Sequence, residues 1–340
     1  MPAPVVLIVP VLLLVAGLLH MVPEFTRHDL FFAVTVPPEF RFSNGGRRIL
    51  VRYRGILWVS TLIAIATVLA TGLPLAAVLI PGAGILWAFV SSHKRALAFA
   101  AAPNPIREVD LGAPREGLPG GPIMALLPVI ALAGLGLWGE LHLDRLPDRL
   151  VVHWGLDGAD RWVTTTPTTL FGFLAVYAAA CLLLAGVAWG VLHRSRRVST
   201  SGPAAASERQ FRRRMLQMLI VTEYLLVCPA GFALLMPSAP GMTIWLVALA
   251  AVIVAFAVSL FHYGQGGARA TTLSGMAPVG DRTPDGCWKW GMFYVNPADP
   301  SILVEKRFGI GYTVNFGNRW SWVALVAVLV PAALGLLFLR

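Results

Sequence analysis

The chain has 340 residues, of which 57% are hydrophobic and only 13% charged, and its mean hydropathy is +0.71. Because a soluble domain carries about a quarter charged residues, this composition excludes an ordinary soluble domain and predicts an integral membrane protein. The net charge of +10 is spread over segments next to apolar runs, without a nucleic-acid motif. We therefore expect no nucleic-acid partner, and attribute the basic excess to topology and to contact with the lipid bilayer.

Several apolar runs approach or exceed the ~20 residues that a helix needs to cross hydrocarbon. We predict about eight spans, over 4–22, 56–73, 75–92, 122–140, 170–192, 216–236, 243–262 and 321–339. The Gly72-Leu73-Pro74 turn between the second and third predicts a tight helical hairpin. The first run lacks the basic residues that begin a secretory signal, so we expect it to be a span.

The basic residues predict the orientation of these spans. All but four of the 27 Lys and Arg residues fall in four loops, namely 23–55, 93–121, 193–215 and 263–320. The other four are Arg145, Arg149, Arg161 and Arg340. By the positive-inside rule, the four loops are cytoplasmic and both termini lie outside.

The predicted fold is therefore a polytopic all-α membrane bundle with a small β-hairpin outside and a small three-stranded β-sheet inside. We divide the chain into 1–140 with the first four helices, 141–169 as the extracytoplasmic hairpin, 170–262 with helices five to seven, 263–320 as the cytoplasmic β-rich domain, and 321–340 with the eighth helix.

The extracytoplasmic loop contains HWGLDGADRW, residues 153–162, which is unusually polar for this chain. Its flanks are β-branched and aromatic, and Asp157-Gly158 is a strong turn signal, so the pattern predicts a hairpin. Three interpretations stay open: a binding surface, a structural loop, or a metal or catalytic site. The candidate ligand-binding residues are His153, Trp154, Asp157, Asp160 and Trp162, and a metal site could add His142 and Asp144.

Residues 146–162, LPDRLVVHWGLDGADRW, resemble a domain of unknown function found at the start of SdpI-type immunity proteins of bacteria. The matching positions are Leu146, Pro147, His153, Trp154, Gly158, Asp160 and Trp162. In that family the signature follows the first span, whereas here it follows the fourth. The resemblance implies a sensor or immunity-type protein of the bacterial plasma membrane. Such a protein would bind an extracellular peptide, toxin or envelope ligand and relay to a cytoplasmic regulator.

A second stretch, residues 288–318, resembles another domain of unknown function from the same class of bacterial membrane proteins. The motif residues are Trp288, Asn296, Asp299, Lys306, Arg307, Gly309, Gly311 and Asn315. We predict three strands here, over 288–295, 302–306 and 311–316, with turns at Asn296–Pro300 and Phe308–Gly311. The Gly-rich turn could cradle a phosphate, but no helix follows it, so a plain β-turn is favoured. Residues 30–41, LFFAVTVPPEFR, also resemble a segment near the start of these proteins.

Glu223 lies nine residues past Arg214, roughly 13 Å into the bilayer at the rise of a helix. An ionisable group at that depth costs on the order of 2.5–3.5 kcal/mol, so it usually faces a pathway or a partner helix. We predict that Glu223 lines a polar cavity, with Thr222 and Tyr224 sharing its hydrogen bonds. The alternative is a protonated Glu that only bridges helices.

No zinc-protease, Walker, nucleophile-elbow or intramembrane-protease pattern occurs in the chain. We therefore expect no enzyme, no cofactor and no bound metal. Two alternatives to the sensor remain, a secondary transporter or permease that uses Glu223, and a membrane enzyme with a metal site near His153.

Overall fold

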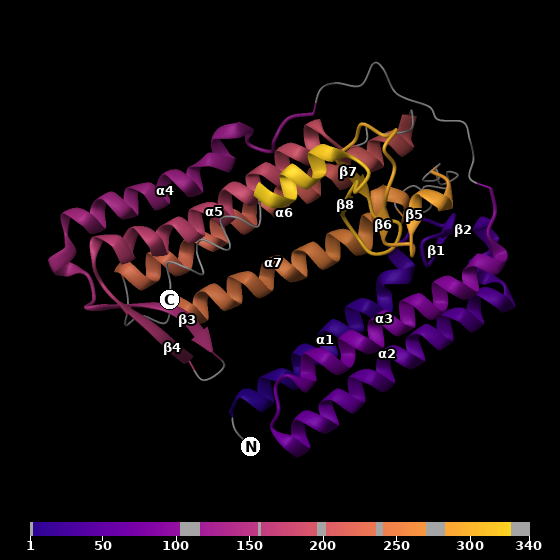
Figure 1. Ribbon diagram of the computed structural model, residues 1–340, viewed down its shortest axis with the longest axis horizontal. Helices are drawn as coiled ribbons and strands as arrows, with labels where there is room; N and C mark the ends of the chain where they lie inside the picture. The colour runs from indigo at the N-terminus through magenta and orange to yellow at the C-terminus, as the bar shows by residue number, and fades with distance from the viewer. Residues whose placement is uncertain are drawn as a thin grey trace.

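The computed structural model describes residues 3–102, 116–155, 158–195, 202–235, 241–269 and 283–327. Seven of its helices are long and apolar enough to cross a membrane (Figure 1). They are α1 Ala3–Phe25, α2 Asn44–Thr71, α3 Ala76–Ala96, α4 Gly121–Leu141, α5 Pro167–His193, α6 Gly202–Leu235 and α7 Gly241–Tyr263. The mostly helical, multi-pass prediction is confirmed to that extent. Of the predicted eighth span, residues 321–327 are helical and the rest lies outside the described residues.

Two helices begin well before the predicted spans. α2 starts at Asn44 and α6 at Gly202, so the prediction of loops over 44–55 and 202–215 is wrong. The arginines in both stretches are good helix formers, and the Ser43 hydroxyl caps α2 by accepting a hydrogen bond from the Gly46 amide. Hydropathy marks only the apolar part of a helix and misses its polar continuation.

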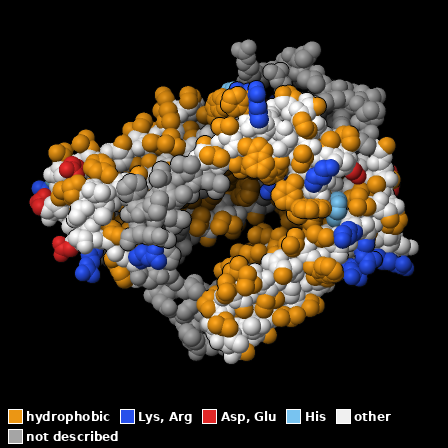
Figure 2. All heavy atoms as spheres, in the orientation of Figure 1, with side chains coloured by type: hydrophobic (Ala, Val, Ile, Leu, Met, Phe, Trp, Pro, Cys, Tyr) orange, Lys and Arg blue, Asp and Glu red, His pale blue; other side chains and the backbone are white. Residues whose placement is uncertain are grey.

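The helices form two groups, α1–α3 and α4–α7, each closely packed within itself. α1 meets α7 near the C-terminal ends of the two helices, where the rings of Phe25 and Phe261 lie edge to face, 5.9 Å between centroids. Figure 2 shows the molecule hollowed between the two groups, with hydrophobic side chains around the opening. The contacts that join the two helix groups therefore lie mainly at one end of the bundle.

Within the first group, α2 and α3 pack closely around Gly84. A Cβ atom at Gly84 would lie 2.2 Å from the Ser60 hydroxyl oxygen of α2. Small residues at such contacts let the backbones of membrane helices approach each other.

Replacing Gly84 by Leu should therefore force α2 and α3 apart. We expect a loss of about 1–3 kcal/mol, the usual cost of overpacking, seen as a lower melting temperature of the purified protein in detergent. Gly82→Leu is the matched control, because a Cβ there meets nothing within 4 Å. Equal melting temperatures for the two variants would contradict the close approach.

In the part of the chain that the structure describes, four two-stranded antiparallel sheets lie outside the helices. Their pairs are β1 Leu30–Phe31 with β2 Val34–Thr35, β3 Arg149–Gly155 with β4 Gly158–Thr164, β5 Trp288–Lys289 with β6 Phe293–Tyr294, and β7 Leu303–Glu305 with β8 Tyr312–Val314. The β3–β4 hairpin was predicted, and it forms with its turn between Gly155 and Gly158.

The predicted three-stranded sheet is wrong. Residues 288–295 do not form one strand, because Trp290 (φ 52°) and Gly291 (φ 71°) turn the chain back on itself and make a separate hairpin. A parallel bridge between Tyr294 and Asn315 joins this hairpin to the next one, and Trp288 and Tyr294 pack with Val304 of β7. The turn at 308–311, between β7 and β8, forms as predicted.

Candidate functional site

The segment 283–318, which we call the C-terminal module, covers one end of the helix bundle, and the β3–β4 hairpin lies at the other (Figure 1). We call these the module end and the hairpin end. The module contains the short helix η5 Asp285–Cys287 and both hairpins β5–β8. The residues singled out from the sequence lie in the module, in the β3–β4 hairpin and, for Glu223, in α6.

Asn315 holds the loop of the module together. Its side chain is fully buried, and its Nδ2 donates to the carbonyl oxygens of Asn296 (2.9 Å), Asp299 (3.1 Å) and Ser301 (3.2 Å). Its Oδ1 accepts from the amides of Asn296 (3.0 Å) and Gly317 (3.1 Å). Every hydrogen-bonding position of this amide is used inside the module, so Asn315 acts on the fold of the loop.

Tyr294 connects the other two polar motif residues. Its fully buried hydroxyl donates to Asp299 Oδ2 at 3.0 Å and accepts from Asn296 Nδ2 at 3.0 Å. Asp299 Oδ1 also accepts from the Ser301 amide at 2.9 Å. The predicted motif residues Asn296, Asp299 and Asn315 are thus brought together, as one network that shapes the 296–301 loop.

The Gly-rich turn is a plain turn. The Lys306 amide donates to the Gly311 carbonyl at 3.0 Å, and the Lys306 side chain is exposed. Gly309 (φ 85°) and Gly311 (φ 95°) take left-handed conformations that favour glycine. Gln265, in the short helix η4 Gln265–Gly267 after α7, donates to the Gly311 carbonyl and accepts from its amide. Sequence reasoning did not find Gln265.

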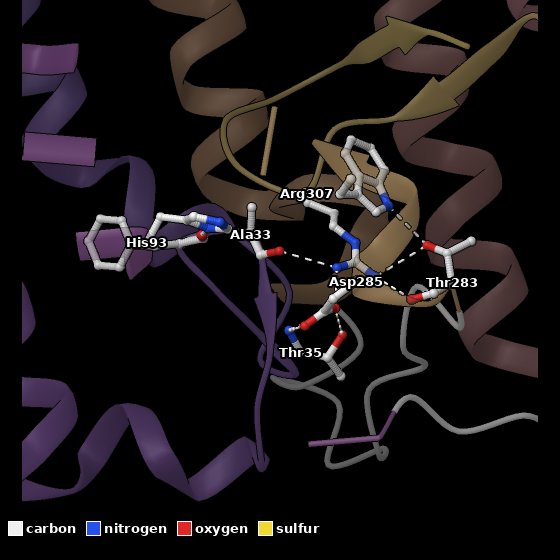
Figure 3. Close-up of polar contacts among 8 residues, drawn as sticks. Ala33, Thr35, His93, Thr283, Asp285 and Arg307 are labelled. Carbon is white, nitrogen blue, oxygen red and sulfur yellow. Dashed lines mark hydrogen bonds and ion pairs between the residues drawn. The ribbon is translucent and has the colours of Figure 1, made fainter. Parts of the chain in front are cut away.

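Arg307 is the centre of the module. Its side chain is fully buried, yet its guanidinium reaches four oxygen atoms (Figure 3). Nη1 donates to Asp285 Oδ1 at 2.5 Å and to the Ala33 carbonyl at 3.2 Å, while Nη2 donates to the carbonyl and the hydroxyl of Thr283. The ring of Trp288 lies 5.3 Å from the guanidinium carbon, at cation–π distance.

The first hairpin, β1–β2, is the surface on which Arg307 docks. Its turn residues Phe32 (φ 47°) and Ala33 (φ 67°) are left-handed without being glycine, which costs of order 1–3 kcal/mol each. This turn exposes two backbone carbonyls to side chains. The Phe32 carbonyl oxygen lies 2.8 Å from His93 Nδ1, and the Ala33 carbonyl oxygen accepts a hydrogen bond from Arg307. The Thr35 hydroxyl then donates to Asp285 at 2.7 Å, so Arg307 and Asp285 hold the turn of the hairpin and its second strand, β2 (Figure 3).

Phe308 adds an apolar contact beside these bonds. Its ring stacks on Phe32 at 5.2 Å and lies 4.8 Å from Phe89 and 6.1 Å from Tyr53, between centroids. These partners belong to the β1–β2 hairpin, α3 and α2, so Phe308 packs the module against two helices of the first group and against the hairpin.

The opposite face of the module is packed on the second helix group. Leu303 and Tyr312 lie against Ala188, Val191 and Leu216, which come from α5 and α6. The amides of Ile302 and Leu303 donate to the Arg194 carbonyl just after α5. On the side of α1, the ion pair of Arg27 and Glu305 spans 2.5 Å. The module therefore joins the two helix groups.

At the hairpin end, β3 is anchored by Leu150, which is fully buried among residues of α4, α5 and α6. The register skips Val152 on β3 and Asp160 on β4, so two bulges break the strict alternation of faces. Trp162 is about half exposed, at 48%. Asp157 and the side chains of His153, Trp154 and Asp160 lie outside what the structure describes, so the structure does not test a metal or ligand site there.

His142 is engaged locally. Its Nδ1 lies 2.9 Å from the Trp138 carbonyl, and its ring stacks on that tryptophan. In the described part of the chain no three His, Cys, Asp or Glu residues gather as a metal site would require.

Glu223 is fully buried in α6, facing α5 at Cys181, whose Sγ lies 3.6 Å from the Glu223 carbonyl oxygen. Neither carboxyl oxygen has a hydrogen-bond partner in the described part of the chain. The predicted sharing with Thr222 and Tyr224 is absent there, because the Thr222 hydroxyl donates to the Met218 carbonyl and Tyr224 donates to the Met124 carbonyl.

Comparison with known protein families gives one match. Residues 297–322 match a family of unknown function, DUF5808. Most of this match, over residues 297–318, lies in the C-terminal module. The match includes Asp299, Arg307 and Asn315, and it supports the resemblance of this segment to a domain of unknown function. No curated protein and no solved structure matches the chain, so the SdpI-type resemblance of residues 146–162 remains a prediction.

Proposed function

We propose that this protein is a membrane sensor of the immunity type. In this proposal the β3–β4 hairpin faces the outside of a bacterial plasma membrane and binds a peptide, toxin or envelope ligand. The C-terminal module faces the cytoplasm and passes the signal to a regulator. The concentration of Lys and Arg in the segments of the module end supports this orientation by the positive-inside rule.

One observation carries the proposal: α6, together with its neighbour α5, packs against both pieces. Near its C-terminus, Ala230 and Leu234 share a core with Leu150 of the hairpin. Near its middle, Leu216 packs with Leu303 and Tyr312 of the module. A helix of 34 residues spans about 51 Å, and packed helices slide as rigid bodies. A ligand that moves the hairpin would therefore move α6 against the module.

The relay can be tested with a surrogate ligand. An epitope is inserted between Gly155 and Gly158, and Cys181 and Cys228 are replaced by Ala, which leaves Cys287 as the reporter thiol. Cys287 is half-buried in the module, beside Asp285. We expect binding of a Fab fragment to the epitope to change the rate of Cys287 labelling several-fold in the detergent-solubilised protein.

The control places the same epitope in the Gly72-Leu73-Pro74 turn, which joins α2 and α3 at the hairpin end. A Fab bound there contacts neither α6 nor the β3–β4 hairpin, so the labelling rate should stay unchanged. The relay is wrong if Fab binding at the hairpin also leaves the rate unchanged, or if both positions give the same effect.

A second candidate is a proton-coupled transporter or permease, which the buried, unpartnered carboxyl of Glu223 favours. Glu223→Gln keeps the shape of the side chain but cannot release a proton. We expect this variant to abolish acidification of proteoliposomes under an imposed substrate gradient. Glu140→Gln, at an exposed position of α4, should leave that flux intact. Proteoliposomes of the unaltered protein that show no pH-dependent flux would leave the sensor as the better account.

A further inference from the structure

A pocket of about 520 Å³ opens at the module end of the bundle. Its walls are the segment 116–120 before α4 and one face of α6. Arg209, Gln210 and Arg213 line it from α6, where positions 209 and 213 are one helical turn apart. The volume lies within the range of small-ligand sites.

The charge of the pocket favours an anion. Arg213 is exposed and makes no ion pair or hydrogen bond with any residue that the structure describes. Gly120, which also lines the pocket, is the N-cap of α4, and its position has no side-chain cap, so no side chain there offsets the partial positive charge of that helix end. The acidic residue of the lining, Glu116, lies 3.8 Å from the Arg212 guanidinium, which offsets its charge.

The pocket also has an apolar side, which lies against the core shared by α5, α6 and the C-terminal module. Leu118 and Leu216 line it, and Leu216 belongs to the apolar part of α6. The first exposed residues of α4 beyond the pocket are Ile123 and Met124, which are apolar. A ligand with a charged head and an apolar tail therefore fits this place better than a wholly polar one.

We propose that this pocket binds a phosphate-bearing anion, with an anionic phospholipid of the adjoining leaflet as its source. Arg213 and Arg209 contact the phosphate, Gln210 donates to a headgroup oxygen, and the acyl chains lie along α4 and α6. Basic pockets between membrane helices recognise lipid headgroups in this way. The inference does not depend on the sensor proposal.

The test compares Arg213→Ala with Arg214→Ala in the full-length protein. Arg214 is the matched control, because it is exposed and next in sequence but donates to Gln217 at 3.0 Å and does not line the pocket. Native mass spectrometry measures the binding of short-chain phosphatidylglycerol and of phosphatidylcholine with the same chains. We expect phosphatidylglycerol to bind more tightly, with about fivefold loss in Arg213→Ala and little loss in Arg214→Ala.

A competition arm separates the two sources of phosphate. If inorganic phosphate leaves phosphatidylglycerol bound, the lipid is the ligand. If it displaces the lipid from the unaltered protein but not from Arg213→Ala, the site holds a soluble phosphate-bearing anion instead. The proposal is overturned if the two lipids bind equally, or if both arginine variants lose the same affinity.

Discussion

Replacing Arg307 by Ala is expected to detach the C-terminal module from the first helix group and to cost about 3–5 kcal/mol of stability, the usual effect of breaking a buried ion pair. Asp285 would keep its charge in a partly buried place, and the carbonyls of Ala33 and Thr283 would lose their donor. The measurement is the melting temperature in detergent, together with the rate of proteolysis within 283–318.

The same site offers its own controls. Arg307→Lys should not restore stability, because one ammonium group cannot reach Asp285, Ala33 and Thr283 in the planar geometry of a guanidinium. Lys306→Ala, the exposed neighbour, should change stability by less than about 0.5 kcal/mol. If Arg307→Ala melts and is cleaved like Lys306→Ala, then Arg307 does not hold the module in place.

Asp285→Ala tests the pair from the other side. It removes the carboxylate from the buried arginine and leaves the contacts with the neutral oxygens of Ala33 and Thr283, so we expect a loss close to that of Arg307→Ala. The double variant should lose clearly less than the two losses added together, since the second change removes a group whose partner has already gone.

The membrane helices and the β3–β4 hairpin could be predicted because their signals are local. An apolar run of about 20 residues specifies a spanning helix, and Asp157-Gly158 between β-branched strands specifies a turn. That helices begin at Asn44 and Gly202 was not predicted from the sequence, because hydropathy identifies only the apolar part of a helix and not its polar first turns. The separate β5–β6 hairpin was missed because Trp290 gives no sign that it takes a positive φ.

The Arg307 site could not be predicted, because its parts are far apart in the chain. Thr35 and Asp285 are separated by 250 positions, and no periodicity or spacing pairs them. The positive-inside rule also counts every arginine in a loop as evidence that the loop is cytoplasmic, whatever contacts its side chain makes. Arg27, Arg41 and Arg307 are instead buried and bind carboxylates, hydroxyls or carbonyls. Only burial distinguishes such an arginine from one that faces lipid headgroups.

Three of the predicted motif residues of the module have a structural part in its loop. Asn296, Asp299 and Asn315 bind one another and the backbone around them. The residues of this short motif, with its Asn-Pro, Asp-Pro and paired glycines, therefore determine the conformation of a loop. The exposed surface that this loop supports is where a partner of the module is to be sought.

Asn315→Asp is expected to unfold the module, with a loss of at least about 3 kcal/mol, although it changes one nitrogen to oxygen. The new oxygen would face the carbonyls of Asn296, Asp299 and Ser301, all within 3.2 Å, and each would lose its hydrogen bond. Burial and these carbonyls favour the neutral acid, which raises the pKa of the new carboxyl above its unfolded value. The variant should therefore be less destabilised at low pH and lose stability as the pH rises through that pKa.

The matched control is Asn318→Asp, three residues along the same loop. Asn318 is half-buried, and its Nδ2 donates mainly to the Pro300 carbonyl at 3.0 Å. Its Oδ1 accepts from the Trp320 amide, where an aspartate serves equally well as a helix cap. We expect a loss of about 1 kcal/mol or less, with little dependence on pH. If thermal unfolding at two pH values gives the same profile for both variants, the loop does not depend on the amide of Asn315. Selective loss in Asn315→Asp would show that one buried side chain sets the loop on which the DUF5808 motif is built.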